Sequence, residues 1–362
     1  MRLDVAAALV DGVLVRGDVE VADGRVAAVG LAGGGSGIAV PGFVDLQVNG
    51  FAGVDFATAD AAGYRQAGEA LLETGVTAYQ PTLITAPEEE LVAALAEVPT
   101  GTTVPLVLGA HLEGPFLSPA FLGAHRPAAR RDPDAGVLRR LLAAGPVSQM
   151  TLAPELPGAL ELVDLLREHG IVVSFGHSDA TAAEAHAGFD RGVATVTHLF
   201  NAMRPFHHRE PGIAGAALAR DDVLVQLVAD GRHLADETIR VVCGAARGRV
   251  AVVSDAISAA GAGDGSFRLG GVDVDVRGGV ARRADGVLAG STSTLVAAVR
   301  ELHRLGAPLA EALAAATTVP ARIARRGDIG TLRPGAGADL VVLDDTLEIR
   351  RVLVAGTERV AA

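Results

Sequence analysis

Short apolar runs alternate with Ala- and Leu-rich segments of helical period over most of the chain, a pattern typical of repeated β/α units. The eight runs are AVPGFVDL, VTAYQPTL, VPLVLGAHL, SQMTLAP, IVVSF, VATVTHL, VLVQLVAD and VAVVS. They show little polar alternation, as expected of strands buried on both faces of a parallel sheet. Helices are expected between them, over residues 61–74, 87–96, 134–143, 157–169, 181–191 and 235–246. This order predicts a closed, TIM-like (β/α)8 barrel of the α/β class.

The two ends of the chain have a different pattern. Residues 1–39 contain short alternating strands separated by two Asp-Gly turns, which is a hairpin signal. The segment GTLRPGAGADLVVLDD and the following IRRVLVAG are again turn-rich and strand-like. We therefore expect a small β-sandwich domain built from residues 1–39 and 330–362, and a catalytic barrel domain over residues 40–329.

A Gly-rich segment at residues 260–285 follows the eighth run and contains a short strand pair. Active sites of such barrels lie at the carboxyl ends of the strands. This insertion is therefore expected to overhang the site, and the sequence leaves open whether it moves as a lid.

Composition narrows the classes of function. The chain has 362 residues, of which 49% are hydrophobic and 20% are charged, which is ample for a buried core. Its formal net charge of −12 leaves no basic excess to neutralise phosphates. This argues against binding to nucleic acid or to an anionic membrane surface. An anionic substrate must therefore be held by a local cationic pocket.

The cellular compartment is indicated by two further features. Cys243 is the only cysteine, which excludes intrachain disulfides and fits a reducing compartment. Asp4 and Asp11 interrupt the apolar start of the chain before it reaches the length of a signal peptide or a membrane span. We therefore expect a cytoplasmic protein.

Four of the apolar runs end in a side chain that can bind a metal or transfer a proton. Glu113 follows the third run, His177 the fifth, His198 lies at the end of the sixth, and Asp255 follows the eighth. The ends of parallel strands meet at one mouth of a barrel. One carboxylate and two imidazoles can hold a zinc-type ion and leave a position for water. Asp255 then remains free for proton transfer, which contributes roughly 10²–10⁴-fold in rate.

Each of these residues also has a structural alternative. His111 lies two residues before Glu113 on the same strand face, and it is equally consistent with a packed interior histidine. His177 or His198 alone would more often be structural, and Asp255 can be the N-cap of a following helix. The occurrence of all four groups at strand ends favours a hydrolytic metal site.

A second group of histidines and arginines also follows the apolar runs. As isolated residues most of them would be solvated at the surface. Together they oppose the acidic charge of the chain and indicate capture of a local anion such as a phosphate. The members are His125, Arg126, His207, His208, Arg209, Arg232 and His233.

Longer motifs join these residues in one order along the chain. They are PGFVDLQVNG, HLEGPF with GAH, TLAPE, FGHSDAT, THLFNAM with HREPG, ADGRH, SDA and LAGST. With these motifs the chain resembles the N-acetylglucosamine-6-phosphate deacetylases of the metal-dependent amidohydrolase superfamily. The motifs extend from Pro41 to about Thr294, and the β segments at both ends suit the small domain of that family.

The resemblance implies hydrolysis of the acetamido group of N-acetyl-D-glucosamine 6-phosphate to acetate and D-glucosamine 6-phosphate, in amino-sugar catabolism or cell-wall recycling. It maps the metal ligands to Glu113, His177 and His198, the catalytic aspartate to Asp255, and support of the oxyanion to His125. The substrate contacts that it implies are Ala124, His125, Asn201, Ala202, Arg209, Asp230, Gly231, Arg232, His233, Leu288, Ala289 and Gly290. It also implies a homodimer, in which one phosphate contact comes from the neighbouring subunit.

One position departs from the wider superfamily. Many amidohydrolases carry a His-x-His pair after the first strand that binds a second metal, whereas this chain has Gln47 and Asn49 there. Because amides are poor ligands for a zinc-type ion, this vestigial second-metal position predicts one essential metal. The chain also contains no lysine, so relatives that bridge two metals with a carboxylated lysine are excluded.

The metal and the sugar leave alternatives. A Glu-His-His set suits Zn²⁺ first, and also Fe²⁺, Co²⁺ or Mn²⁺. An epimeric substrate such as N-acetylgalactosamine 6-phosphate differs from the glucosamine derivative only in the orientation of one hydroxyl group. A non-catalytic, amidohydrolase-like binding protein is a further alternative, although none of the four chemical residues is missing.

Overall fold

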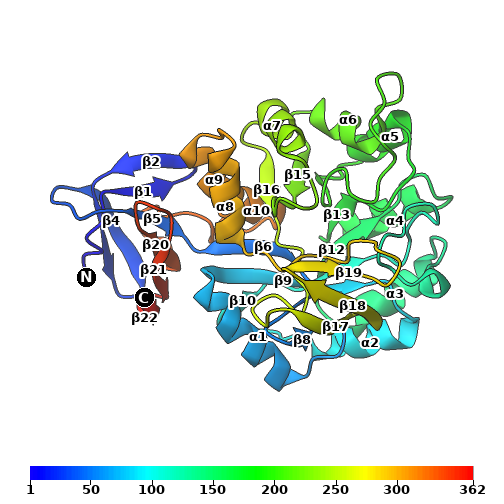
Figure 1. Cartoon of the computed structure of the whole chain (residues 1–362), viewed down its shortest axis with the longest axis horizontal. Helices are drawn as coiled ribbons and strands as arrows, with labels where there is room; N and C mark the ends of the chain where they lie inside the picture. Colours follow the sequence, from blue (N-terminus) through cyan, green and yellow to red (C-terminus); the bar gives the residue numbers. More distant parts are fainter. Residues whose placement is uncertain (362) are drawn as a thin grey trace.

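The computed structural model describes residues 1–361 and consists of a central parallel barrel with a β-sheet layer at one end (Figure 1). All eight apolar runs form strands of the barrel within the described residues, as predicted. In chain order they are β6 (Phe43–Val48), β9 (Val76–Ile84), β11 (Ala110–Glu113), β12 (Val147–Leu152), β13 (Val172–Phe175), β14 (Thr195–Val196), β15 (Leu224–Leu227) and β16 (Val250–Val252). The short β10 (Leu106–Val107), which precedes β11 in the chain, also pairs with β9.

The first and last barrel strands meet through a seam that depends partly on side chains. The backbone nitrogen of Asp255 donates to the carbonyl of Gln47 at 3.0 Å. The backbone nitrogen of Ser254 donates to Oδ1 of Asp45 at 3.2 Å. Because the seam ends at Asp255, it fixes one wall of the barrel mouth.

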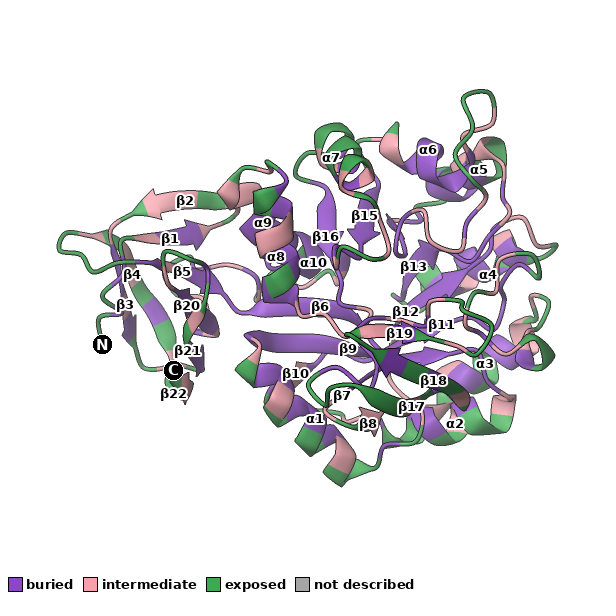
Figure 2. Cartoon of the chain, viewed as in Figure 1, coloured by how far each residue is buried: buried purple, intermediate pink, exposed green. Residues whose placement is uncertain are grey.

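Six helices on the outside of the barrel match the predicted segments to within two residues. They are α1 (Ala61–Glu73), α2 (Glu88–Glu97), α3 (Ala135–Ala144), α4 (Ala159–Glu168), α5 (Ala182–Asp190) and α7 (Asp236–Ala245). Asp60, Asp134 and Thr181 cap α1, α3 and α5 with their side chains. Figure 2 shows the barrel strands buried, with exposed residues on the outer faces of the helices.

Four further helices were not predicted from the sequence. They are α6 (Gly212–Leu218), α8 (Leu295–Arg304), α9 (Leu309–Ala315) and α10 (Thr318–Ile323). The short α6 contains two glycines, and burial of most of its residues stabilises it in place of helix propensity. No helix among the described residues is both long and apolar enough to cross a membrane.

The two chain ends share one sheet, whose order is β2 (Val13–Arg16), β1 (Ala7–Val10), β5 (Ile38–Pro41), β20 (Leu340–Leu343), β21 (Ile349–Val354) and β22 (Thr357–Ala361). The hairpin β3 (Asp18–Ala22) and β4 (Arg25–Leu31) packs beside it. Asp11 and Asp23 have φ values of 51° and 50°, as a tight Asp-Gly hairpin turn requires. The exact domain boundaries at residues 39 and 330 stay a prediction.

The insertion after the eighth strand is a three-stranded antiparallel sheet, so the prediction of a strand pair was incomplete. We call it the flap, and its strands are β17 (Gly265–Leu269), β18 (Val272–Arg277) and β19 (Val280–Arg282). The remaining short strands are β7 (Gly50–Phe51) and β8 (Val54–Asp55). Leu269 and Val274 of the flap pack against Ile84 and Ile257 next to the barrel mouth. The flap therefore overhangs the mouth, as expected.

Candidate active site

A cavity of about 340 Å³ lies at the carboxyl ends of the barrel strands. It brings together most of the residues predicted from the sequence. Those that line it are Asn49, Glu113, Ala124, His125, His177, His198, Asn201, Ala202, His233, Asp255, Leu288 and Gly290. Phe121, Leu269 and Val287 add an apolar wall.

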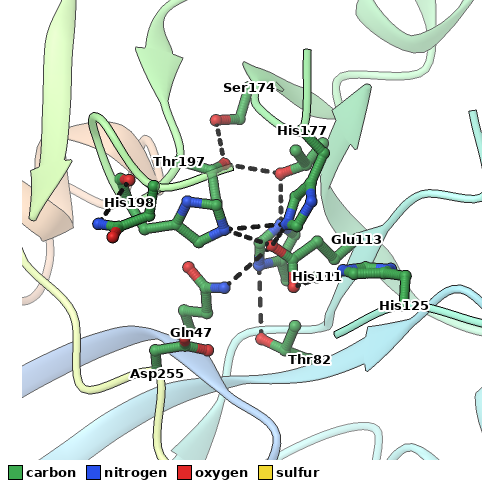
Figure 3. A network of polar contacts seen from close by, with 12 residues as sticks. Gln47, Thr82, His111, Glu113, His125, Ser174, His177, Thr197, His198 and Asp255 are labelled. Carbon is green, nitrogen blue, oxygen red and sulfur yellow. Dashed lines mark hydrogen bonds and ion pairs between the residues drawn. The ribbon is translucent and has the colours of Figure 1, made fainter. Parts of the chain in front are cut away.

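Glu113, His177 and His198 converge at the base of this cavity (Figure 3). Oε1 of Glu113 lies 3.1 Å from Nε2 of His177 and 2.8 Å from Nε2 of His198. The two imidazole nitrogens are 3.1 Å apart. Burial alone would raise the pKa of Glu113, but hydrogen bonding to the two imidazoles lowers it well below its usual value. The carboxylate is therefore held in its charged form.

The hydrogen bonding of His177 shows that this group of residues fits a cation. Its Nδ1–H donates to the carbonyl of Phe121 at 2.8 Å. In the neutral ring, Nε2 then carries a lone pair that faces the Glu113 carboxylate. Two acceptors this close need a positive charge between them, which is either a second proton on the ring, as in the hydrogen bond to Glu113, or a bound cation. Carboxylate and neutral imidazole are also the ligands that zinc-type ions prefer.

His125 forms a second, overlapping cluster with two of these residues. Ligand atoms of Glu113, His125 and His177 lie within 4.8 Å of one another, so distance alone does not choose between the two sets of three. Nδ1 of His125 accepts the backbone N–H of Thr85 at 3.2 Å. Its Nε2 therefore carries the hydrogen in the neutral ring and is a donor rather than a ligand. Burial lowers the pKa of His125 to about 3, which keeps the ring neutral.

Asp255 lies at the seam of the barrel and borders the same cavity. Its Oδ1 accepts the side-chain N–H of Asn49 at 2.8 Å. Burial and the nearby carboxylate of Glu113 raise the pKa of Asp255 to about 6. A carboxyl group with a pKa near neutrality can both accept and deliver a proton, which general acid–base catalysis requires.

Three of the four chemical residues have a backbone conformation that side chains seldom adopt. The φ values of His177, His198 and Asp255 are 50°, 28° and 49°. Strained backbone of this kind persists where the surrounding structure holds it, and it clusters at functional sites. Gly290 contributes to that support, because a Cβ at this position would lie 2.8 Å from the carbonyl oxygen of Asp255.

The loop after His177 is held by a carboxylate to which the sequence reasoning gave no role. Glu155 follows β12 and accepts hydrogen bonds from Oγ of Ser178 at 2.6 Å and from the backbone nitrogen of Asp179 at 2.7 Å. Its place in the TLAPE motif at a strand end was an available signal. Phe121, which orients His177, gave no such signal, because it acts through its backbone carbonyl. Thr85 orients His125 through its backbone nitrogen and its hydroxyl, and it lies in no motif that marked it.

His111 does not border the cavity. It is fully buried, its Nε2 lies 2.7 Å from Oγ1 of Thr151, and burial lowers its pKa to about 4. His111 is thus the packed interior histidine that was one of the two alternatives.

The basic residues of the second cluster are divided by the structure. His233 borders the cavity, and Asp230 holds it through a contact of 2.8 Å between Oδ2 and Nδ1. Arg209 is exposed and contacts His208. Arg209, Asp230, Gly231, Arg232 and Ala289 are not among the residues that border the cavity. Within the described part of the chain, the cavity lining contains no arginine.

Comparison with known proteins gives one consistent group. The model of the amidohydrolase family matches residues 38–359. The chain is 39% identical to the N-acetylglucosamine-6-phosphate deacetylase of Mus musculus over 341 residues, covering 89% of this chain and 83% of that one. It is 36% identical to the N-acetylgalactosamine-6-phosphate deacetylase of Escherichia coli O157:H7 over 359 residues, covering 93% of each. A mutant N-acetyl-D-glucosamine-6-phosphate deacetylase from Mycobacterium smegmatis, solved with N-acetyl-D-glucosamine-6-phosphate, matches with a TM-score of 0.95 and 37% identity, covering 100% of this chain and 99% of that one.

Proposed function

The chain belongs to the amidohydrolase family, and on that premise we propose that it hydrolyses N-acetyl-D-glucosamine 6-phosphate to acetate and D-glucosamine 6-phosphate. The observation that carries the proposal is the convergence of Glu113, His177 and His198 within 3.1 Å, beside Asp255, in the cavity at the barrel mouth. This arrangement supplies a cation site and a separate proton-transfer group, which amide hydrolysis needs.

We assign Glu113, His177 and His198 as the ligands of one divalent ion, with zinc first and iron, cobalt or manganese as alternatives. When bound, such an ion lowers the pKa of water and polarises the amide carbonyl. Gln47 and Asn49 occupy the place of a second-metal pair, and their amide nitrogens donate to Glu113 and Asp255. This donation supports a site with one ion.

The protein groups divide the remaining work. Asp255 accepts the proton of the attacking water and delivers it to the nitrogen of the leaving amine. The Nε2–H of His125, which points away from Thr85, is placed to donate to the carbonyl oxygen as negative charge develops on it. Because the ring stays neutral, it stabilises this charge without losing a proton to it.

The phosphate needs a cationic partner, and the described cavity lining of one chain contains no arginine. We propose that His233 contacts the phosphate from within and that Arg209 reaches it from the neighbouring subunit of a homodimer. The exposure of Arg209 and the absence of arginine from the described cavity lining support this arrangement. Ala124, Asn201, Ala202 and Leu288 are further proposed contacts of the sugar. The cytoplasmic location stays a prediction.

A second candidate keeps the chemistry and changes the sugar. The 36% identity to an N-acetylgalactosamine-6-phosphate deacetylase favours testing this epimer. The two sugars differ at one hydroxyl, and a polar group that meets one epimer and not the other discriminates strongly.

The test is acetate release from both phosphosugars, with the metal content measured on the same sample and Asp255→Asn as the inactive control. We expect turnover of the glucosamine derivative to exceed that of the galactosamine derivative. If only the galactosamine derivative is turned over, the second candidate function replaces the first. No acetate from either sugar in a metal-loaded sample would disprove the proposal.

A further inference from the structure

Asn49 has one polar atom with a partner and one without. Its Nδ2 donates to Oδ1 of Asp255 at 2.8 Å. Its Oδ1 is buried and has no hydrogen-bond partner among the described residues, although the side chain borders the active-site cavity. A buried acceptor without a partner is unfavourable, and in native proteins such a group calls for an explanation.

The orientation of this amide is determined by its neighbours. An ionised carboxylate only accepts hydrogen bonds, so the nitrogen of Asn49 must face Asp255 and the oxygen must face away from it. The backbone of Asn49 is also fixed. Its backbone N–H donates to the carbonyl of Ala256 at 2.7 Å, and its backbone carbonyl accepts the N–H of Phe56 at 3.0 Å. Among the described buried amides whose oxygen has no partner, Asn49 is the one that borders the active-site cavity, so a molecule bound there is in a position to supply the missing donor.

We propose that Asn49 is a positioning and specificity residue, whose Nδ2 holds the carboxylate of Asp255 and whose Oδ1 accepts the N–H of the acetamido group of the substrate. The inference rests on the proposed function. In the reaction, the oxygen of water bonds to the carbonyl carbon, the C–N bond breaks, and the nitrogen gains a proton through Asp255. The original N–H stays on the nitrogen throughout, so Asn49 fits both the amide and the amine product.

This role predicts discrimination between an amide and an oxygen ester. An ester has no N–H, so it leaves Oδ1 of Asn49 unpaired, as in the free protein. Loss of the contact to Asp255 slows both substrates, because both need the same proton transfers. Loss of the acceptor slows only the amide.

Gln47 provides a matched control. It is also a buried amide whose nitrogen donates to a carboxylate of the site, Oε1 of Glu113 at 3.2 Å, and whose oxygen has no partner among the described residues. Unlike Asn49, it does not border the cavity. Replacement of Gln47 should therefore slow the two substrates equally.

The experiment compares kcat/KM for N-acetylglucosamine 6-phosphate and 2-O-acetylglucose 6-phosphate in the wild type, Asn49→Ala and Gln47→Ala, each with measured metal content. We expect the ratio of kcat/KM for the amide to kcat/KM for the ester to fall about tenfold or more in Asn49→Ala. This is the scale of the free-energy cost of leaving a buried polar group unpaired. The ratio should stay unchanged in Gln47→Ala. An unchanged ratio in Asn49→Ala would overturn the inference, while wild-type protein inactive on the amide would overturn the proposed function instead.

A measurement on wild-type protein covers the case in which Asn49→Ala does not fold. Two inert inhibitors are compared, glucosamine 6-phosphate carrying a methanesulfonamide and the sulfone in which CH₂ replaces the N–H. We expect the sulfone to bind about tenfold more weakly. Equal inhibition constants would contradict the role of Asn49 as an acceptor.

Discussion

Oδ1 of Asp45 lies 3.2 Å from the backbone nitrogen of Ser254. A buried carboxylate on the first barrel strand therefore accepts a hydrogen bond from the residues that follow the last barrel strand. Asp255 follows Ser254 directly, and its own nitrogen donates to Gln47 two residues after Asp45. The carboxylate of Asp45 thus replaces part of the backbone pairing at the seam and positions the proposed catalytic aspartate.

The charge state of Asp45 should appear in the pH dependence of stability. Burial raises its pKa from 3.8 to about 7, so the folded protein binds this proton more tightly than the unfolded chain does. The stabilisation is fully present below about pH 4 and is lost as the pH rises through 7. We expect the stability of the wild type relative to Asp45→Asn to be greater at pH 5 than at pH 8, by roughly 2 kcal/mol.

Urea midpoints of both proteins at the two pH values measure this difference. Asp344→Asn is a suitable control, because hydrogen bonds from Thr346 and Glu348 lower the pKa of its carboxylate, which therefore stays charged at both pH values. A constant difference between wild type and Asp45→Asn across this range would show that Asp45 keeps one protonation state.

Replacement of Asp255 should separate chemistry from metal binding. Asp255→Asn keeps the size of the side chain and can still hydrogen-bond to Asn49, but it cannot take a proton. We expect kcat to fall by roughly 10²–10⁴-fold while the metal content per chain stays at the wild-type value. Loss of metal together with activity would instead make Asp255 a ligand.

The barrel could be predicted from the sequence because buried parallel strands are continuously apolar, as in IVVSF before His177. The chemical residues were found for the same reason, since a polar side chain directly after such a run is conspicuous. Asp45 lies inside the run AVPGFVDL and not after it, so its role is less conspicuous in the sequence. What the sequence cannot express is orientation: the tautomer of His125 depends on the backbone of Thr85, forty residues away in the chain.

The helices show a similar limit. Periodicity predicted α1 to α5 and α7, whose faces are amphipathic, but not α6, in which nearly every residue is buried. The flap was recognised as Gly-rich, yet its third strand is only three residues long and depends on pairing with β18. Short elements that tertiary pairing stabilises leave little local pattern.

His125 should contribute through an N–H and not through charge. His125→Ala removes the donor, and we expect kcat to fall by roughly 10²–10³-fold. His125→Gln retains an amide N–H in a neutral side chain, so its loss should be smaller. Steady-state kinetics at one metal loading test this order, and equal losses in both variants would argue against a donor role.

Metal removal should lower stability through the same cluster. Without a cation, Oε1 of Glu113 and Nε2 of His177 face each other as acceptors at 3.1 Å. We expect chelation to lower the melting temperature of the wild type and added zinc to restore it, since a ligand that binds only the folded state stabilises it. Glu113→Gln should melt at the same temperature with and without chelator, and a chelator effect in that variant would locate the ion elsewhere.

The tip of the flap is attached to the barrel by Asp55, whose Oδ2 accepts the backbone N–H of Gly270 at 2.9 Å. Leu269, the preceding residue, borders the active-site cavity, while Gly270 borders a second cavity of about 710 Å³. The tip therefore lies where the two cavities adjoin. Loss of its attachment should loosen the wall that Leu269 gives to the substrate.

We expect Asp55→Ala to raise KM by about five- to tenfold with a smaller change in kcat, at the scale of one lost hydrogen bond. Trypsin should also cleave the variant faster at Arg268 and Arg277 of the flap. Asp264→Ala is the matched control, because Asp264 accepts from Gly278 and Gly279 at the other turn and does not border the cavity. If both variants raise KM equally, the whole flap and not its tip determines substrate binding.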